Sequence, residues 1–388
     1  MDFTSALYLG LRHPSRSLRS WSALTTGAPA ALMSPRGAGK TAQALADLIG
    51  CERTILLPST LHAFWDLFGL LATQNIAIYL DAESYPIMHW GGERAVAHGV
   101  PLRLFPHHDV ERLRRLLRAD MCKGIKPVIA VDGFCPACGT SAPVKEYLAL
   151  ARKHKGYLLL DDTQALGVFG QNPQHSIPYG LGGGGSLRLH NIYGPEVIVV
   201  SSLAKGFGVP VTVLAGSRNL VNWFANRSET RIHCSPPSVA VIHAVEHALQ
   251  INAAYGDQLR RHLARLVLSF SRMLAAAGIR LLKGLFPVQT LLPENSGLDV
   301  NAVRLHDALL DCGIRSVLHH GHSGRRAQLS FLLTARHELD DIVQSAEVLR
   351  RILCTEASIE VNHDHRLPLP CRKRRRSHRP LGHTGITW

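Results

Sequence analysis

Short apolar runs alternate with amphipathic segments along the first half of the chain. Apolar residues recur with helical spacing at 41–50, 62–72, 110–120 and 144–156, and short apolar runs lie at 53–59, 75–81, 101–107, 126–133 and 157–162. Short apolar strands between amphipathic helices are typical of a buried, mainly parallel sheet. The pattern therefore predicts an α/β domain.

The pattern changes after a glycine-rich stretch at 180–186. Two further apolar runs, at 196–202 and 211–217, are predicted to complete the same sheet. The segment from Ser238 to Gly278 has helical periodicity and no proline, which favours a long helix leading into a second domain. We predict an N-terminal segment at 1–40, a large domain at 41–240, a smaller α+β C-terminal domain at 241–358 and a basic, disordered tail at 359–388.

Composition supports a globular chain. Of the 388 residues, 46% are hydrophobic and 19% are charged, which is enough apolar material for a large and a small core. The start has no basic region typical of a signal peptide, and the most apolar early stretch is interrupted by Asp66, Gln74 and Asn75, so no membrane span is expected. Eight scattered cysteines indicate reduced thiols in a cytoplasmic protein.

The net charge of +14 is unevenly distributed. Seven basic residues and no acidic residue lie between Arg366 and Trp388, so half of the excess belongs to the tail. A run of this kind is more often a solvated arm than a specific contact, and nucleic acid is not an expected partner.

Two short motifs suggest chemistry that the rest of the sequence does not support. Gly39-Lys40-Thr41 resembles the end of a phosphate-binding P-loop, but Ser34 stands where that motif needs its first glycine. Cys135 and Cys138 have the spacing of half a zinc site or of a redox pair, but no second pair stands at metal-ligand spacing. We therefore expect two loop thiols and no metal site.

Lys205 is the strongest candidate for catalysis. It follows the apolar run at 196–202 and lies among small residues and glycines, in Ser-Ser-Leu-Ala-Lys-Gly-Phe-Gly. A buried lysine is costly unless it is neutralised, and an imine removes its charge while creating an electrophile. Asp161 ends the run at 157–162, where parallel strands present their side chains to ligands, although a capping aspartate would fit equally well there.

Four blocks in order resemble the α-oxoamine synthases, a family of enzymes that depend on pyridoxal 5'-phosphate (PLP). They are DFTSALYLGLRHP near the start, PVKEYLALARKHKGYLLLDDTQALGVFG, SSLAKGFG around Lys205, and LLTARHELDDI near the end. The resemblance runs along most of the chain and implies the PLP-dependent transferase fold type I. That fold has a mainly parallel, seven-stranded sheet in the large domain, with a smaller α+β C-terminal domain.

The resemblance also implies roles for individual residues around the ring of the cofactor. Lys205 would carry pyridoxal 5'-phosphate as a Schiff base, and Asp161 would pair with the pyridine nitrogen and keep the ring cationic. Tyr85 stands where the family has a stacking histidine, so it would stack on the ring. Gln164 replaces a histidine that bonds the ring oxygen, and its amide can still donate that hydrogen bond.

Further residues are implied around the phosphate and the lysine. Ser59 and Thr60 fall at a predicted helix start suited to phosphate binding by backbone amides, and Ser202 would neighbour the phosphate or the lysine. The family's active site commonly lies between two subunits, so the resemblance also implies a homodimer.

Two departures from the family concern the carboxylate of the substrate. Ala6 and Ser330 replace the asparagine and the arginine that the family uses there. A bidentate arginine is hard to replace, so either Arg325 or Arg326 reaches into the site, or the substrate lacks a carboxylate at that place.

Three functions remain open from the sequence. The leading hypothesis is a PLP-dependent acyltransferase that condenses a small amine with an acyl thioester. An aminotransferase of the same fold would use the same lysine and cofactor. The changes at Ala6, Gln164 and Ser330 also motivate a catalytically weakened scaffold paralogue, whereas retention of Lys205 and Asp161 argues against it.

Overall fold

The computed structural model describes residues 1–120, 124–282, 284–292, 294–295, 298–299, 301–319 and 327–363. The chain divides into two compact units. The larger unit comprises Ala6–Ala264 and Thr334–Arg336, and the smaller unit comprises Met1–Ser5, Arg265–Leu333 and the chain from His337 onward.

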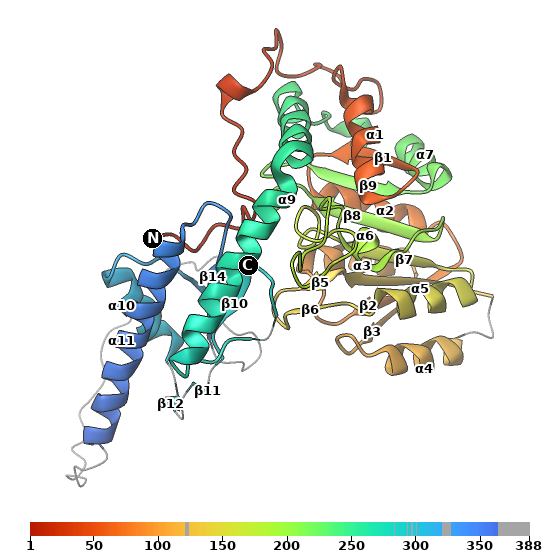
Figure 1. Cartoon of the computed structure of the whole chain (residues 1–388). Helices are drawn as coiled ribbons and strands as arrows, with labels where there is room; N and C mark the ends of the chain where they lie inside the picture. Colours follow the sequence, from red (N-terminus) through yellow and green to blue (C-terminus); the bar gives the residue numbers. More distant parts are fainter. Residues whose placement is uncertain are drawn as a thin grey trace, which may run out of the picture. The chain divides into compact units, whose positions relative to one another are not determined.

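A seven-stranded sheet with the order β1-β9-β8-β7-β4-β2-β3 forms the centre of the larger unit (Figure 1). All neighbouring strands are parallel except at β9, which runs antiparallel to both β1 and β8. The predicted mainly parallel sheet is thus confirmed. Its strands are β1 (Arg53–Leu57), β2 (Ile76–Asp81), β3 (Leu102–Phe105), β4 (Lys126–Asp132), β7 (Tyr157–Asp161), β8 (Val197–Ser202) and β9 (Thr212–Gly216).

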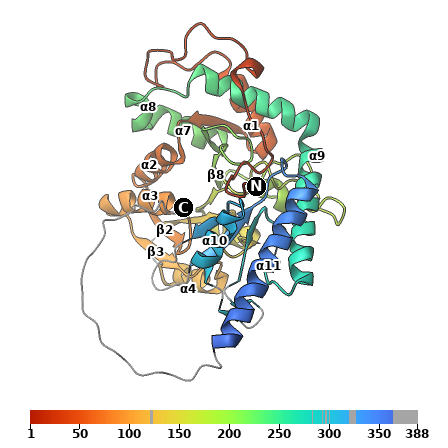
Figure 2. The same cartoon turned by 90° about the vertical axis from the view of Figure 1, so that its left-hand side faces the viewer.

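Helices cover both faces of this sheet. Up to His233, the helices of this unit are α1 (Ala38–Ile49), α2 (Thr60–Leu71), α3 (Pro86–Ala97), α4 (Val110–Asp120), α5 (Val144–Lys153), α6 (Ser186–His190), α7 (Arg218–Arg227) and α8 (Glu229–His233), and a 3-10 turn η1 (Ser15–Ser17) precedes α1. A short hairpin, β5 (Phe134–Cys135) and β6 (Thr140–Ser141), follows β4. Figures 1 and 2 both show α2 and α3 lying side by side.

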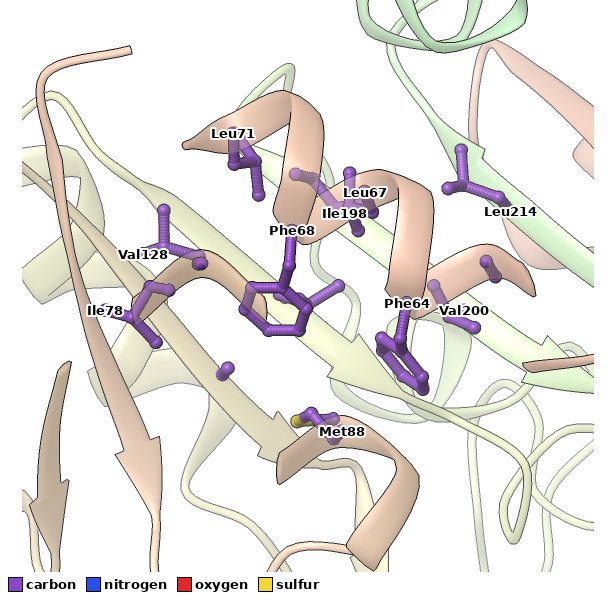
Figure 3. Close-up of a cluster of buried hydrophobic side chains, with 14 of the residues drawn as sticks. Phe64, Leu67, Phe68, Leu71, Ile78, Met88, Val128, Ile198, Val200 and Leu214 are labelled. Atoms are coloured by element: carbon purple, nitrogen blue, oxygen red, sulfur yellow. The ribbon is translucent and has the colours of Figure 1, made fainter. Parts of the chain in front are cut away.

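One face of the sheet packs under α2, and the sequence of this helix explains why. Phe64, Leu67, Phe68 and Leu71 recur at helical spacing and are fully buried (Figure 3). They contact alternate residues of the strands, such as Ile78. Burying a side chain of this size stabilises the fold by about 1.5–3 kcal/mol. The helix is therefore held firmly over the sheet, which fixes the strand ends that carry the polar residues.

The smaller unit contains an antiparallel sheet with the order β10-β14-β13. Its elements are β10 (Val288–Thr290), β11 (Glu294–Asn295), β12 (Leu298–Asp299), α10 (Ala302–Asp311), β13 (Val317–His319), β14 (Gln328–Leu332) and α11 (Leu339–His363). The helices α10 and α11 pack against each other. Helix α11 continues to His363, so the first part of the predicted tail at 359–388 is helical, and the rest lies outside the described residues.

Two boundaries differ from the sequence prediction. The long helix α9 (Val239–Ala276) is continuous, and the division between the units falls within it, after Ala264 and not at 240/241. The first five residues belong to the smaller unit and not to a separate segment at 1–40. Phe3 explains this placement because it is fully buried against Phe270 and Phe331, with ring centroids 6.3 and 5.6 Å away.

Candidate active site

Polar residues gather where the parallel strands of the larger unit end. Asp132 ends β4, Asp161 ends the neighbouring β7 in direct register with it, and Ser202 ends β8. Lys205 follows β8 after a tight turn. Because the carboxyl ends of parallel strands share one edge, these residues lie where α/β proteins bind ligands.

The turn that holds Lys205 depends on its glycines. A side chain at Gly206 would collide with the carbonyl oxygen of Leu166, and Gly208 has a φ of +67°. The backbone N–H of Phe207 donates to the carbonyl of Leu203 at 3.2 Å. The motif therefore lets the turn pack closely against the chain after β7, which keeps Lys205 at the sheet edge.

Lys205 is half-buried, which is less than the sequence suggested. Removal of water from its ammonium group lowers the pKa of Lys205, although the charges of Asp161 and Asp132 act in the opposite direction. A lysine with a lowered pKa has a larger neutral fraction, and only the neutral amine can act as a nucleophile or a base.

The two carboxylates beside Lys205 are poorly stabilised as anions. Burial raises the pKa of Asp161, although hydrogen bonding from Thr163, whose N–H lies 3.0 Å from Oδ1, and the charge of Lys205 partly offset this. Burial and then the charge of Asp161 raise the pKa of Asp132 well above its usual range. Among the residues that the structure describes, neither carboxylate has a basic partner within ion-pair distance. Both would be stabilised by an added cation.

Tyr85 lies next to this pair of carboxylates. It caps the start of α3, and its N–H donates to both oxygens of Asp132, at 3.1 and 3.3 Å. Burial raises the pKa of Tyr85, and the charges of Asp161 and Asp132 add to this. The structure therefore places Tyr85 beside Asp132 and within electrostatic reach of Asp161, and its stacking role stays a prediction.

Gln164 is oriented by a residue that the sequence reasoning missed. The hydroxyl of Tyr8, a buried residue, donates to Oε1 of Gln164 at 2.8 Å. This contact uses the carbonyl oxygen of the amide and leaves its NH₂ group as a donor. Tyr8 belongs to the N-terminal block that resembles the α-oxoamine synthases, so the resemblance could have indicated that it lies near the cofactor site.

The remaining predicted residues of the cofactor site have well-defined local roles. Ser59 is the N-cap of α2, and its hydroxyl lies 2.8 Å from Nδ1 of His62, while Thr60 is the first residue of that helix. The N–H of Ser202 donates to Oγ1 of Thr163 at 3.0 Å. Within the described part of the chain, no hydrogen bond joins Ser59 or Thr60 to Lys205, so their role in phosphate binding stays a prediction.

A cavity of about 730 Å³ opens beside the lysine turn. The ring nitrogen Nε2 of His13, a lining residue, lies 2.8 Å from the carbonyl oxygen of Phe207 and so connects the cavity wall to that turn. The lining includes three arginines that were not singled out in the sequence, namely Arg12, Arg16 and Arg336. A cavity of this size with several cationic groups fits a sizeable anionic ligand.

One of the two carboxylate departures, Ser330, is taken up by a contact inside the smaller unit. Ser330 lies in β14, fully buried, with its hydroxyl 2.7 Å from that of Thr290 on β10. This pair is satisfied internally and offers no cation to a substrate. Arg325 and Arg326, the predicted replacements, lie outside the described residues.

The residues at the sheet edge fit PLP. The half-buried amine of Lys205 can bond the aldehyde of the cofactor, and Asp161 offers the anion that a protonated ring nitrogen needs. Asp132, Thr163 and Tyr8 support these groups but were not predicted. Asp132 could have been found, since it ends an apolar run in the same way as Asp161.

Comparisons with known proteins agree with this arrangement. The sequence profile of the family described as aminotransferase class I and II matches residues 4–317. The 8-amino-7-oxononanoate synthase from Chromobacterium violaceum is 29% identical over 364 residues, covering 90% of this chain and 88% of that protein. The resemblance predicted from the four sequence blocks is confirmed.

Solved structures support the fold. A serine palmitoyltransferase from S. paucimobilis matches with a TM-score of 0.78 and 19% identity, covering 90% of this chain and 86% of that one. The 8-amino-7-oxononanoate synthase from Francisella tularensis matches with a TM-score of 0.66 and 20% identity, covering 92% and 98%. The predicted fold type I is thus confirmed. In the described part of the chain, no helix combines the length and the apolarity that crossing a bilayer requires.

Proposed function

Because the chain belongs to the aminotransferase class I and II family and is a PLP-dependent enzyme, we propose that it condenses a small amine with an acyl thioester. The observation that carries this proposal is the placement of Lys205, Asp161 and Asp132 at one edge of the sheet. Similarity to an 8-amino-7-oxononanoate synthase over 90% of the chain supports a condensation of this type.

The cavity beside the lysine turn supports an anionic acyl donor. Arg12, Arg16 and Arg336 line it together, and arginine side chains suit phosphate groups because each presents several fixed N–H donors. An acyl thioester on a phosphate-bearing carrier such as coenzyme A has this chemistry. We propose that these three arginines supply the anion contacts, and that Arg325 and Arg326 contribute less.

Lys205 and Asp161 would have distinct roles in the condensation. PLP, when bound, supplies an electron sink that stabilises a carbanion on the carbon next to the amine of the substrate. Lys205 would hold the cofactor and then remove and return a proton at that carbon, for which its lowered pKa is suited. Asp161 would accept a hydrogen bond from the ring nitrogen. A new carbon–carbon bond forms as the carbon–sulfur bond of the thioester breaks and the thiol leaves.

Other residues would hold the cofactor in place. Tyr85 would stack on the ring, the NH₂ group of Gln164 would donate to the ring oxygen, and backbone amides at Ser59 and Thr60 would bind the phosphate with Ser202 nearby. These interactions orient the ring, which matters because a small misplacement lowers the rate strongly.

The test uses the purified full-length protein loaded with PLP. Small amines are supplied with acyl-CoA thioesters, and thiol release is measured together with the mass of the product. Release of thiol that depends on both substrates, with none from Lys205→Ala, is expected. Stoichiometric conversion of PLP to pyridoxamine phosphate by the amine alone would instead identify an aminotransferase. Absence of any PLP-dependent reaction would favour the scaffold hypothesis.

We further propose that the enzyme works as a homodimer in the cytoplasm. The resemblance to the α-oxoamine synthases supports the dimer, and five described cysteines that form no disulfide support a reducing compartment. Light scattering on the protein as it elutes from a sizing column measures the assembly directly, and a monomeric mass would contradict this part of the proposal.

A further inference from the structure

A second group of polar side chains lies in the larger unit, apart from Lys205. His107 follows β3, and Cys135 and Cys138 lie on the hairpin formed by β5 and β6. The two sulfur atoms and a ring nitrogen of His107 all lie within 4.8 Å of one another. The sequence suggested two loop thiols without a metal, because His107 stands far from the cysteines along the chain.

The hairpin directs both sulfur atoms to one place. The N–H of Gly139 donates to the carbonyl of Cys135 at 2.9 Å, and Gly139 has a φ of +74°, so the chain turns sharply between the cysteines. Cys135 is buried and Cys138 is half-buried. Two cysteines separated by two residues are a common ligand pair for zinc, and this turn already holds them together.

His107 is oriented as a third ligand. Its Nδ1 lies 2.9 Å from Oδ1 of Asp81, and its Nε2 lies 3.3 Å from Sγ of Cys138. A carboxylate on one ring nitrogen of a histidine fixes the other nitrogen toward a metal in many zinc sites. Around a tetrahedral zinc ion, a nitrogen and a sulfur ligand are about 3.6 Å apart. The observed 3.3 Å therefore requires only a small adjustment.

We propose that Cys135, Cys138 and His107 bind a divalent metal ion of the zinc class, with Asp81 as a positioning residue. The ion takes the place of the proton shared by Nε2 and Sγ of Cys138, and Cys135 loses its thiol proton, so that two protons in all leave to solvent and the metal is held by two thiolates and a neutral imidazole. The fourth position is left to a solvent molecule. This site does not depend on the proposed function, because none of its ligands belongs to the PLP site.

The ion would strengthen a link that now rests on side-chain contacts, of His107 with Cys138 and of His108 with Thr140. It would join the end of β3 to the hairpin after β4, and β4 ends at Asp132, which binds the N–H of Tyr85. Its expected role is therefore to hold the loop beside the cofactor site.

The experiment titrates Co²⁺ into the full-length, reduced and metal-free protein. Thiolate ligands give Co²⁺ an intense near-ultraviolet charge-transfer band, and tetrahedral geometry gives visible bands. Saturation at one Co²⁺ per chain and displacement by Zn²⁺ are expected. Cys135→Ser and Cys138→Ser should lose the charge-transfer band, and Asp81→Asn should weaken binding by about 10–100-fold. Cys312→Ser, an exposed thiol in the smaller unit, serves as the matched control and should retain full binding.

Three results would overturn the proposal. One is the absence of a charge-transfer band in the wild-type protein while circular dichroism shows that it is folded. Another is a Cys312→Ser variant that loses the band as fully as Cys138→Ser does. The third is a disulfide between Cys135 and Cys138 in protein purified without reductant, with no metal bound after its reduction.

Discussion

The carboxylates that end neighbouring strands of the sheet fall into two groups whose pKa values shift in opposite directions. The first is Asp81 alone, and the second is Asp132 with Asp161. Asp81, at the end of β2, accepts hydrogen bonds from the backbone N–H groups of Glu83 and His108 and lies 2.9 Å from the ring of His107. Burial tends to raise the pKa of Asp81, but these contacts together lower it. Asp132 and Asp161, at the ends of β4 and β7, have raised pKa values because burial dominates.

The contrast distinguishes a carboxylate that positions another side chain from carboxylates that await a ligand. The chain itself supplies the donors around Asp81, so its charge is satisfied and it can hold His107 in place. Asp161 accepts too few hydrogen bonds to stabilise its negative charge, and a cationic ligand would compensate that charge. An uncompensated charge at a strand end is thus a better sign of a ligand site than the position alone.

Replacement of Lys205 by alanine tests the second group most severely. The change removes both the attachment point of PLP and the proposed base, so activity is expected to fall by at least about 10⁴-fold. The visible absorbance of lysine-bound PLP, and its reduction by borohydride, should also disappear. Lys155→Ala is the matched control, because Lys155 lies in the turn before β7 and its loss should change neither property. Residual lysine-linked PLP in Lys205→Ala would contradict the assignment.

Asp161→Asn tests whether this carboxylate pairs with the ring of PLP. Breaking a buried ion pair costs about 3–5 kcal/mol, which corresponds to a rate loss on the order of 10²–10⁴-fold. Asp162→Asn is the control, because Asp162 is equally buried but its Oδ2 accepts from the N–H of Ser186, at 2.9 Å. Activity and the spectrum of bound PLP are compared between the two variants. Equal losses would show that burial and not position explains the effect.

The opposite pKa shifts predict opposite effects on stability. The lowered pKa of Asp81 contributes stability above the ordinary carboxyl pKa that is lost as pH falls through the folded-state value. The raised pKa of Asp132 contributes stability at low pH that is lost as pH rises through its folded-state value. At neutral pH, Asp81→Asn should therefore destabilise the fold by about 1.5–3 kcal/mol, while Asp132→Asn should stabilise it.

The measurement is the melting temperature of each variant, free of PLP and metal, at acidic and neutral pH. Each 1 kcal/mol corresponds to roughly 2–4 °C for a domain of this size. The two variants should differ in sign at neutral pH, and the effect of Asp132→Asn should shrink at acidic pH, where the wild-type carboxyl is already neutral. Shifts of the same sign would remove the distinction between the two groups.

The sequence predicted the larger fold, and it singled out two of the polar residues that the structure places at one edge of the sheet. Alternating apolar runs and amphipathic segments are local signals, and they located the sheet because a parallel sheet is built from such units. Lys205 and Asp161 were singled out because Asp161 ends one apolar run and Lys205 lies three residues after another. The same rule applies to Asp132, which ends the apolar run at 126–133 and was not predicted.

The proposed metal ligands His107, Cys135 and Cys138 could not be found by spacing alone. His107 and Cys138 are 31 positions apart, and only the crossover through α4 and β4 brings them within 3.3 Å. Ligand-spacing rules search for partners nearby in sequence, whereas a parallel sheet joins the ends of strands separated by a helix. The position of Phe3 in the smaller unit was missed for the same reason, since its partners Phe270 and Phe331 lie near the other end of the chain.

The smallest expected effect concerns the hydrogen bond between Tyr8 and Gln164. Tyr8→Phe removes a bond between neutral groups that is worth about 0.5–1.5 kcal/mol, so activity should fall by roughly 2–10-fold. Tyr147→Phe is the matched control, because the hydroxyl of Tyr147 is buried without a hydrogen-bond partner in the described structure, and its removal should leave activity unchanged. If Tyr8 acts by orienting Gln164, then Tyr8→Phe should cause no further loss in a Gln164→Ala background. Additive losses would mean that Tyr8 supports the site by another route.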